Sequence, residues 1–366
     1  MILTVSKNEL MKSLTDIQGI VERKSTMPIL SHFLLDCHAK PYLYATDLDT
    51  AIKIQNLEFK IQKEGAIAIP AKTFISLIKE LEGDIVLEAK ENFKLKISAG
   101  KVSAEIACLN PQEFPAWPEI EDGNELTLPV KALKDIIEKT AYAASDADTR
   151  YVFNGILLHL QKEGLHAVGT DGHRLALLRL EGKDAKFNIQ EEFKVILPKK
   201  AVNELKRLVS DDTVTIKIGK NHVLFKTPNM EFLTKVIEGT YPNYEQVIPR
   251  SSTKTLISLK TDLEKALRRV SIISRERSNA IKLDMKDNTL IVSASNPDLG
   301  SAEEELSVKY DGDPFTIGFN ARYILDTLEV IEKDEIVMQF NDPLGPSLLK
   351  GAGDENYLSV IMPMRI

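Results

Sequence analysis

One arrangement of apolar and polar residues recurs three times along the chain. At residues 195–208, VILPKKAVNELKRL, an apolar run predicts a strand that Pro198 stops. Proline suits the first turn of a helix, and apolar residues then recur at helical spacing. The same pattern appears at residues 67–81, IAIPAKTFISLIKEL, and at residues 316–331, TIGFNARYILDTLEVI. Each copy therefore predicts a strand that runs directly into a helix.

The three copies also match residue by residue. Aligned at the end of the strand, they place a base at one position and an apolar residue two positions later. The bases are Lys72, Lys200 and Arg322, and the apolar residues are Phe74, Val202 and Ile324. The spacing between copies is close to one third of the 366-residue chain.

A second strand-to-helix unit repeats at nearly the same period. It occurs at residues 3–10, 126–133 and 256–263, and its first copy carries a capping box, Ser6-x-x-Glu9. Two different units in the same order, three times, indicate a chain built from three copies of one large module.

The size of the repeat indicates whole domains. A chain of 366 residues is too long for one ordinary core, whereas domains of about 120 residues are typical. We predict three domains, at residues 1–121, 122–250 and 251–366. Within each domain we predict the order β-α-β-β-β twice in succession. Alternation within the strands favours antiparallel sheets covered by helices on one face, and the fold class is α+β.

Composition narrows the cellular setting. Hydrophobic residues make up 43% of the chain, with no apolar run near the ~18 residues that span a membrane. Charged residues interrupt the N-terminal stretch MILTVSKNELMKS, which therefore does not resemble a signal peptide. Two cysteines, Cys37 and Cys108, lie in apolar runs and suggest a reducing compartment. We expect a cytoplasmic protein.

The segment TDGHRL at residues 170–175 is the best candidate for catalysis. Asp171 and His173 invite a dyad interpretation, but residues i and i+2 of a strand seldom reach triad geometry. Asp-Gly is ordinary turn chemistry, and no G-x-S-x-G motif accompanies it. We predict no catalytic residues and no enzyme activity.

The histidines do not suggest a metal site. His159, His166 and His173 are spaced by seven residues, and Gly164 predicts a hairpin turn between the first two. The chain has no C-x-x-C pair, no P-loop and no G-x-G-x-x-G motif. We therefore predict no metal and no cofactor.

Basic residues gather on the predicted helices, while acidic residues gather in loops and linkers, so the net charge of −7 is segregated. These bases could be simple solvated helix faces. Alternatively, they form a basic surface that binds phosphates without reading base sequence. Six 120-residue domains in a ring would leave a hole of roughly 35 Å, against about 5 Å for three. Only the larger hole admits a duplex roughly 20 Å wide.

Five segments resemble one known family. They are R-Y-V-F-N-G at Arg150–Gly155, T-D-G-H-R-L at Thr170–Leu175, Y-P-N-Y at Tyr241–Tyr244, I-G-F-N at Ile317–Asn320, and the final V-I-M-P-M-R-I. Over its whole length the chain resembles the bacterial DNA polymerase III beta subunits, the replicative sliding clamps.

The resemblance implies a homodimeric, head-to-tail ring of six similar domains, with helices lining the inside and antiparallel sheets outside. Such a ring encircles duplex DNA, tethers the replicative polymerase and is loaded by an ATP-driven clamp loader. Repair polymerases and other clamp-motif proteins share its pocket, and it works in the cytoplasm at the nucleoid. The competing interpretation is a monomeric three-module ligand-binding protein, which would elute near its mass of 40.9 kDa.

The resemblance also implies three sets of site residues. The partner-peptide pocket comprises Phe153, Thr170, Gly172, His173, Arg174, Leu175, Pro242, Val247, Asn320, Tyr323, Leu344, Val360, Met362, Pro363, Met364 and Arg365. DNA contacts fall on Arg23, Lys24, Lys72, Arg150, Tyr151, Lys199, Lys200 and Arg207. The dimer interface falls on Ile106, Ile272 and Ile273.

Overall fold

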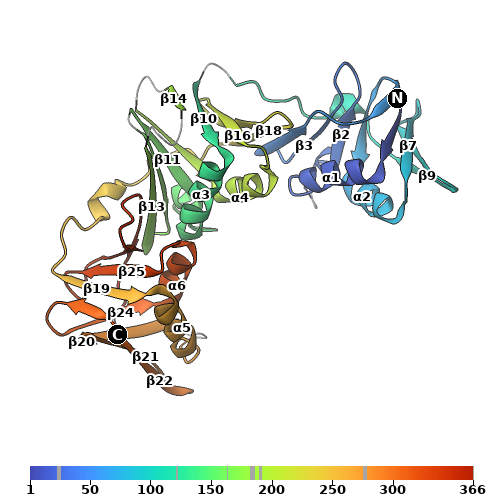
Figure 1. Cartoon of the computed structure of the whole chain (residues 1–366). Helices are drawn as coiled ribbons and strands as arrows, with labels where there is room; N and C mark the ends of the chain where they lie inside the picture. The colour runs from blue at the N-terminus through green and yellow to red at the C-terminus, as the bar shows by residue number, and fades with distance from the viewer. Residues whose placement is uncertain are drawn as a thin grey trace. The chain divides into compact units, whose positions relative to one another are not determined.

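The computed structural model contains every strand-to-helix unit that the sequence predicts. It describes residues 1–22, 26–120, 123–162, 164–181, 186–188, 192–274 and 278–365. Within these residues the helices are α1 (Lys7–Ile17), α2 (Ala71–Glu80), α3 (Val130–Thr140), α4 (Lys199–Leu208), α5 (Lys260–Val270) and α6 (Ala321–Val330). A strand ends at the residue before each of them (Figure 1).

The order of elements repeats six times. A leading strand and a helix are followed by three strands, as predicted, and every second repeat is preceded by one extra short strand. The chain folds into two compact units whose boundaries cross this repeat: one comprises residues 1–130, 186–188 and 204–236, and the other comprises the rest.

The first unit holds two antiparallel sheets. One has five strands in the order β5 (Lys60–Lys63), β1 (Ile2–Ser6), β7 (Asp84–Ala89), β8 (Lys94–Ala99) and β9 (Val102–Ala107). The other has nine: β14 (Lys186–Asn188), β10 (Asn124–Pro129), β16 (Thr213–Ile218), β17 (His222–Lys226), β18 (Met230–Lys235), β4 (Thr50–Ile54), β3 (Tyr42–Thr46), β2 (His32–Asp36) and β6 (Ala66–Pro70). The pairing of β18 with β4 joins strands from distant parts of the chain.

The second unit also holds two antiparallel sheets. Its nine-stranded sheet runs β15 (Phe193–Pro198), β11 (Gly155–Gln161), β12 (Gly164–Thr170), β13 (Arg174–Glu181), β27 (Tyr357–Ile361), β26 (Ser347–Gly351), β25 (Glu335–Phe340), β19 (Lys254–Leu259) and β23 (Lys309–Asp311). Its four-stranded sheet runs β22 (Gly300–Ser307), β21 (Thr289–Asn296), β20 (Ala280–Lys286) and β24 (Phe315–Asn320). Here β13 and β27 form the long-range junction.

Helices cover the sheets with one apolar face each. In α1 the predicted face of Leu10, Leu14 and Ile17 is completely buried, and Ser6 caps the helix by accepting the backbone N–H of Glu9. The apolar residues aligned in the copies at residues 67–81, 195–208 and 316–331 are buried as well: Phe74, Val202 and Ile324. Within its unit, α1 packs against α2, and α5 packs against α6. The α+β assignment is confirmed.

Three local predictions are wrong in detail. Pro198 ends its strand instead of entering the first turn of α4. The apolar run at residues 29–37 also predicts a strand, but this strand starts only at His32, because Pro28–Ser31 form a 3₁₀ turn. Residues 42–54 likewise predict one strand but form two, since the Asp47 carboxylate accepts the N–H groups of Asp49 and Thr50 and closes a turn.

Candidate functional site

A small, mostly apolar cavity lies beside the junction of β13 and β27, with a volume of about 120 Å³. The register sets Leu175 of β13 opposite Val360 of β27. Two segments that stand out in the sequence, TDGHRL and the C-terminal strand, therefore meet at one place. The cavity is lined by Phe153, Thr170, Gly172, Arg174, Leu175, Tyr241, Pro242, Asn243, Tyr244, Val247, Val360 and Met362.

The turn between β12 and β13 forms one rigid wall. The Thr170 hydroxyl donates to the backbone carbonyl of Arg174 at 2.6 Å and accepts the N–H of Gly172 at 3.0 Å. Gly172 has φ of +87°, where a side chain would be strained. Asp171 accepts the backbone N–H groups of His173 and Arg174 at 2.9 and 3.0 Å. The Asp171 carboxylate thus stabilises the turn by accepting backbone hydrogen bonds, which fits a structural role and not a catalytic dyad with His173.

Arg174 holds this wall to the rest of the unit. Its guanidinium, 9% exposed, donates to Asp171 at 3.1 Å, to Asp326 of α6 at 2.6 Å and to the carbonyl of Tyr142 at 2.8 Å. It also lies over the Tyr323 ring, 4.6 Å from the centroid. A buried cation is stable only when its N–H groups have hydrogen-bond acceptors. Here each of the three guanidinium nitrogens of Arg174 donates to one.

Aromatic rings form the opposite wall. Phe153 meets Tyr241 edge to face at 6.3 Å, and the buried Tyr241 hydroxyl donates to the carbonyl of Val168. Burial raises the pKa of Tyr241 far above its usual value, so the phenol stays neutral. A neutral aromatic wall beside apolar side chains suits an apolar side chain of a partner.

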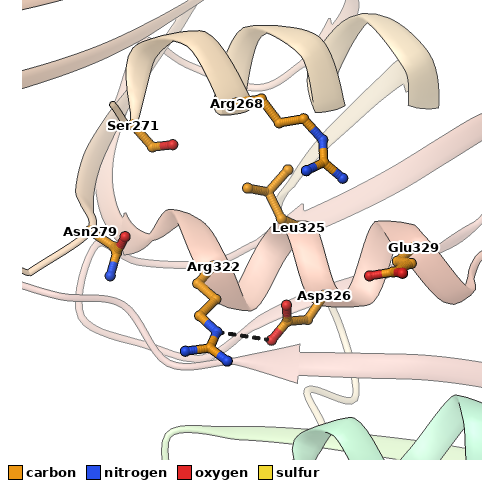
Figure 2. A pocket seen from close by; sticks show the side chains of 7 residues that line it. All are labelled: Arg268, Ser271, Asn279, Arg322, Leu325, Asp326 and Glu329. Atoms are coloured by element: carbon orange, nitrogen blue, oxygen red, sulfur yellow. Dashed lines mark ion pairs between the residues drawn. The ribbon is translucent and has the colours of Figure 1, made fainter. Parts of the chain in front are cut away.

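A second cavity, of about 360 Å³, lies between α5 and α6 (Figure 2). Arg268 of α5 pairs with Glu264 at 2.8 Å, and Arg322 of α6 lies 3.8 Å from Asp326. Both arginines are largely exposed, 59% and 73% at the side chain. Arg322 is one of the bases that align in the three sequence copies, and Arg268 lies on the helix that packs beside it.

Two of the edge strands, β9 and β22, bear on how copies of the chain could join. Among the described strands β9 pairs only with β8, and β22 pairs only with β21. Ile106 on β9 is half-buried, whereas Ile272, just after α5, is 61% exposed, and Ile273 beside it is half-buried. Unpaired edges with exposed apolar side chains invite a further strand.

Comparison with known proteins identifies the chain. It matches the N-terminal, central and C-terminal domains of the DNA polymerase III beta subunit at residues 1–118, 127–243 and 245–365. It is 35% identical to the beta sliding clamp of Caulobacter vibrioides over all of both chains, and 33% identical to that of Pseudomonas putida over 99% of each. A solved sliding clamp from Pseudomonas aeruginosa, bound to griselimycin, is 33% identical, with both chains fully covered and a TM-score of 0.95.

The chain belongs to the DNA polymerase III beta subunit family. Members of this family are non-catalytic sliding clamps, and the match favours that function over a monomeric ligand-binding protein. Within the described residues, no helix of this beta subunit is long and apolar enough to cross a membrane.

The structure gathers part of the predicted pocket into the cavity of this beta subunit. Its lining includes the predicted residues Phe153, Thr170, Gly172, Arg174, Leu175, Pro242, Val247, Val360 and Met362. The other predicted residues lie outside the lining: His173, Asn320, Tyr323, Leu344, Pro363, Met364 and Arg365.

Some of these outlying residues act on the wall. The His173 carbonyl accepts the N–H of Met362 at 2.9 Å, Tyr323 stacks on Arg174, and Asn320 caps α6 through the N–H of Arg322. Tyr241, Asn243 and Tyr244 were missed, although the sequence motif Y-P-N-Y already contained them.

Several predicted DNA-contacting cations of the beta subunit already have partners. Lys199 donates to the Ala144 carbonyl and pairs with Asp146, both at 2.8 Å. Arg150 pairs with Asp148, and its hydrogen bonds lower the pKa of Asp148 to about 2.

Arg207 pairs with Glu204 and donates to carbonyls at the end of α1. Lys72 and Lys200 are exposed in the first turns of α2 and α4, and Tyr151 is 74% exposed. Arg23 and Lys24 lie outside the described residues.

Proposed function

We propose that two copies of this chain close into a ring around duplex DNA and hold the replicative polymerase there. The proposed ring is supported by the number of strands in each sheet. In each nine-stranded sheet, a five-strand set ending in β18 or β27 meets a four-strand set ending in β4 or β13. The remaining sheets are a five-strand set ending in β9 and a four-strand set ending in β22.

Pairing β9 of one chain with β22 of its partner would complete a third sheet of the same kind. The contact is head to tail and, repeated twice, gives a closed dimer of two-fold symmetry in which neither β9 nor β22 is an edge strand any longer. Ile106, Ile272 and Ile273 are the interface residues of this proposal. The protein should elute near twice 40.9 kDa.

We assign the chain three clamp domains, at residues 1–121, 122–250 and 251–366. The second boundary is supported by Tyr244, whose hydroxyl lies 2.8 Å from His159 and 2.9 Å from His166 of the central domain.

Phosphate contacts are proposed for Arg23, Lys24, Lys72, Arg150, Tyr151, Lys199, Lys200 and Arg207. The clamp loader, repair polymerases and other clamp-motif proteins are proposed partners, and the cytoplasmic nucleoid is the proposed location.

Binding to DNA should be topological. Phosphate contacts alone, on a protein of net charge −7, would be weak and would fail at high salt. We expect rings loaded on nicked circular DNA by a clamp loader to survive 1 M NaCl, on the order of a hundredfold longer than rings on the same DNA after linearisation. Gel filtration of the protein–DNA complex measures retention. Retention that depends on salt and ignores DNA ends would contradict the ring.

The pocket should bind partners independently of the ring. Replacing His173 and Tyr323 by Ala, or ending the chain after Ile361, removes the supports of the cavity wall. We expect griselimycin binding, measured by calorimetry, to fall roughly 30-fold or more, as for loss of an interface hot spot. Leu299→Ala, an exposed apolar position outside the lining, is the matched control. The dimer should persist in all variants, and undiminished griselimycin affinity would place the site elsewhere.

A further inference from the structure

Two histidines face each other across the β11–β12 hairpin. In the antiparallel register His159 lies directly opposite His166, and such pairs project from the same face of the sheet. Their ring centroids are 6.0 Å apart and the rings are nearly perpendicular. The hairpin at Gly164, which argued against a metal site in the sequence, is what brings these two side chains together.

A carboxylate completes the cluster. Glu245 belongs to the 3₁₀ turn η5 (Tyr244–Val247), and one ligand atom from each of His159, His166 and Glu245 lies within 4.8 Å of the other two. His159 is 3% exposed, His166 is half-buried and Glu245 is exposed, so the cluster opens to solvent on one side. A cavity of about 290 Å³ beside His166, Tyr244 and Glu245 gives access to it.

The buried histidine is already oriented. Its Nε2 lies 2.6 Å from the Glu192 carboxylate, which makes Nε2 the protonated nitrogen and leaves the Nδ1 lone pair facing the Tyr244 hydroxyl. A histidine whose other nitrogen donates to a carboxylate is the usual arrangement around a bound metal.

Both Nδ1 atoms converge on a single hydroxyl. The Tyr244 oxygen is 2.8 Å from Nδ1 of His159 and 2.9 Å from Nδ1 of His166. A phenol hydroxyl has one hydrogen, so Tyr244 can donate to only one of the two nitrogens. The other Nδ1 then carries a proton and donates to the phenol oxygen, so both rings face one point that this oxygen occupies, and a metal ion bound there would displace it.

We propose that His159, His166 and Glu245 bind one divalent transition-metal ion of the zinc class. Two imidazoles and a carboxylate, with water in the fourth position, are a donor set that zinc accepts. Tetrahedral ligands at 2.0–2.2 Å from zinc lie about 3.3 Å apart, so the cluster must contract, and the exposed Glu245 can move to do so. Arg179 and Arg250 also line this cavity, and the carboxylates of Glu245 there and of Glu192 behind His159 supply negative charge beside the ion.

Equilibrium dialysis of the full chain against zinc chloride, in a non-chelating buffer at pH 7.5, tests the site. We expect one zinc per chain, with affinity reduced at least tenfold in Glu245→Gln and His166→Ala and roughly 10- to 100-fold in Glu192→Gln. Cobalt should give visible absorption bands that the same variants lose. His38→Ala removes an exposed histidine that also contacts a carboxylate, Asp36, and should bind zinc as the parent does.

Glu245→Gln keeps the test decisive. Its side chain is exposed, so the change leaves the sheet folded even if His166→Ala does not. No zinc binding by the parent, or unchanged binding by folded Glu245→Gln, would overturn the proposal. Loss of binding confined to His38→Ala would also overturn it, by placing the metal on the surface pair.

Discussion

Arg174→Ala should destabilise the second compact unit and greatly lower the affinity of the proposed partner pocket for griselimycin. The guanidinium is 9% exposed and holds two carboxylates and one carbonyl. Removing one member of a buried ion pair typically costs about 3–5 kcal/mol, because its partners stay buried without compensation. Asp326 retains 26% exposure, which favours the lower end of that range.

Hydrogen exchange of the amides in β13 and α6 measures this loss as a lower free energy of local opening. Arg322→Ala is the matched control, because Arg322 also approaches Asp326 but is 73% exposed and 3.8 Å away. An exposed pair of this kind contributes at most about 1 kcal/mol. If the two substitutions lowered the free energy of local opening equally, burial would not explain how strongly the Arg174 contacts stabilise the unit.

Arg174→Lys should recover only part of the stability. Lysine keeps the charge, but its single ammonium cannot reach the acceptors that the planar fork serves from three nitrogens. Griselimycin affinity should follow the same order, with the parent strongest, then lysine, then alanine. The pocket wall at Leu175 and Val360 depends on the turn that Arg174 fixes.

Ile272→Ala with Ile273→Ala should convert the proposed dimer into folded monomers. Burying one isoleucine contributes roughly 1.5–3 kcal/mol, and both side chains occur at each of two junctions. The double substitution would then weaken dimerisation by about 6 kcal/mol or more, on the order of 10⁴-fold in Kd.

Sedimentation at micromolar concentration checks this result. Leu259→Ala, 49% exposed at the opposite end of α5, removes similar exposed apolar surface and should leave the dimer intact. Griselimycin binding should be unchanged in both proteins. A double variant that still sediments as a dimer would place the interface away from α5 and β22.

Local patterns predicted the strand-to-helix units well. Proline, cap residues and helical spacing act within a few residues, so Leu10, Leu14 and Ile17 could be assigned to one buried face without knowing what covers it. The turn at Asp171–Gly172 was predictable for the same reason, since its hydrogen bonds close within four residues.

Contacts between distant segments could not be predicted in this way. The sequence showed Lys199 as a surface cation, but its ammonium is taken by the Ala144 carbonyl. It showed His159 and His166 as isolated strand residues, whereas Tyr244 joins them from a segment far along the chain. No local periodicity encodes which strand pairs with which, and the junctions β18–β4 and β13–β27 depend on that choice.

The strand junctions also determine what can fold alone. In the nine-stranded sheet of the first unit, Thr50–Ile54 from the first of the three domains are paired with Met230–Thr234 from the second domain. A protein cut at residue 121 would keep its own helices and lose that partner, exposing a long strand edge prone to aggregation. The three-fold sequence repeat therefore does not mark segments that fold independently. Neighbouring domains share a sheet, and that sheet folds as one unit. Expression of single repeats should accordingly give insoluble protein even though each has the length of an ordinary domain.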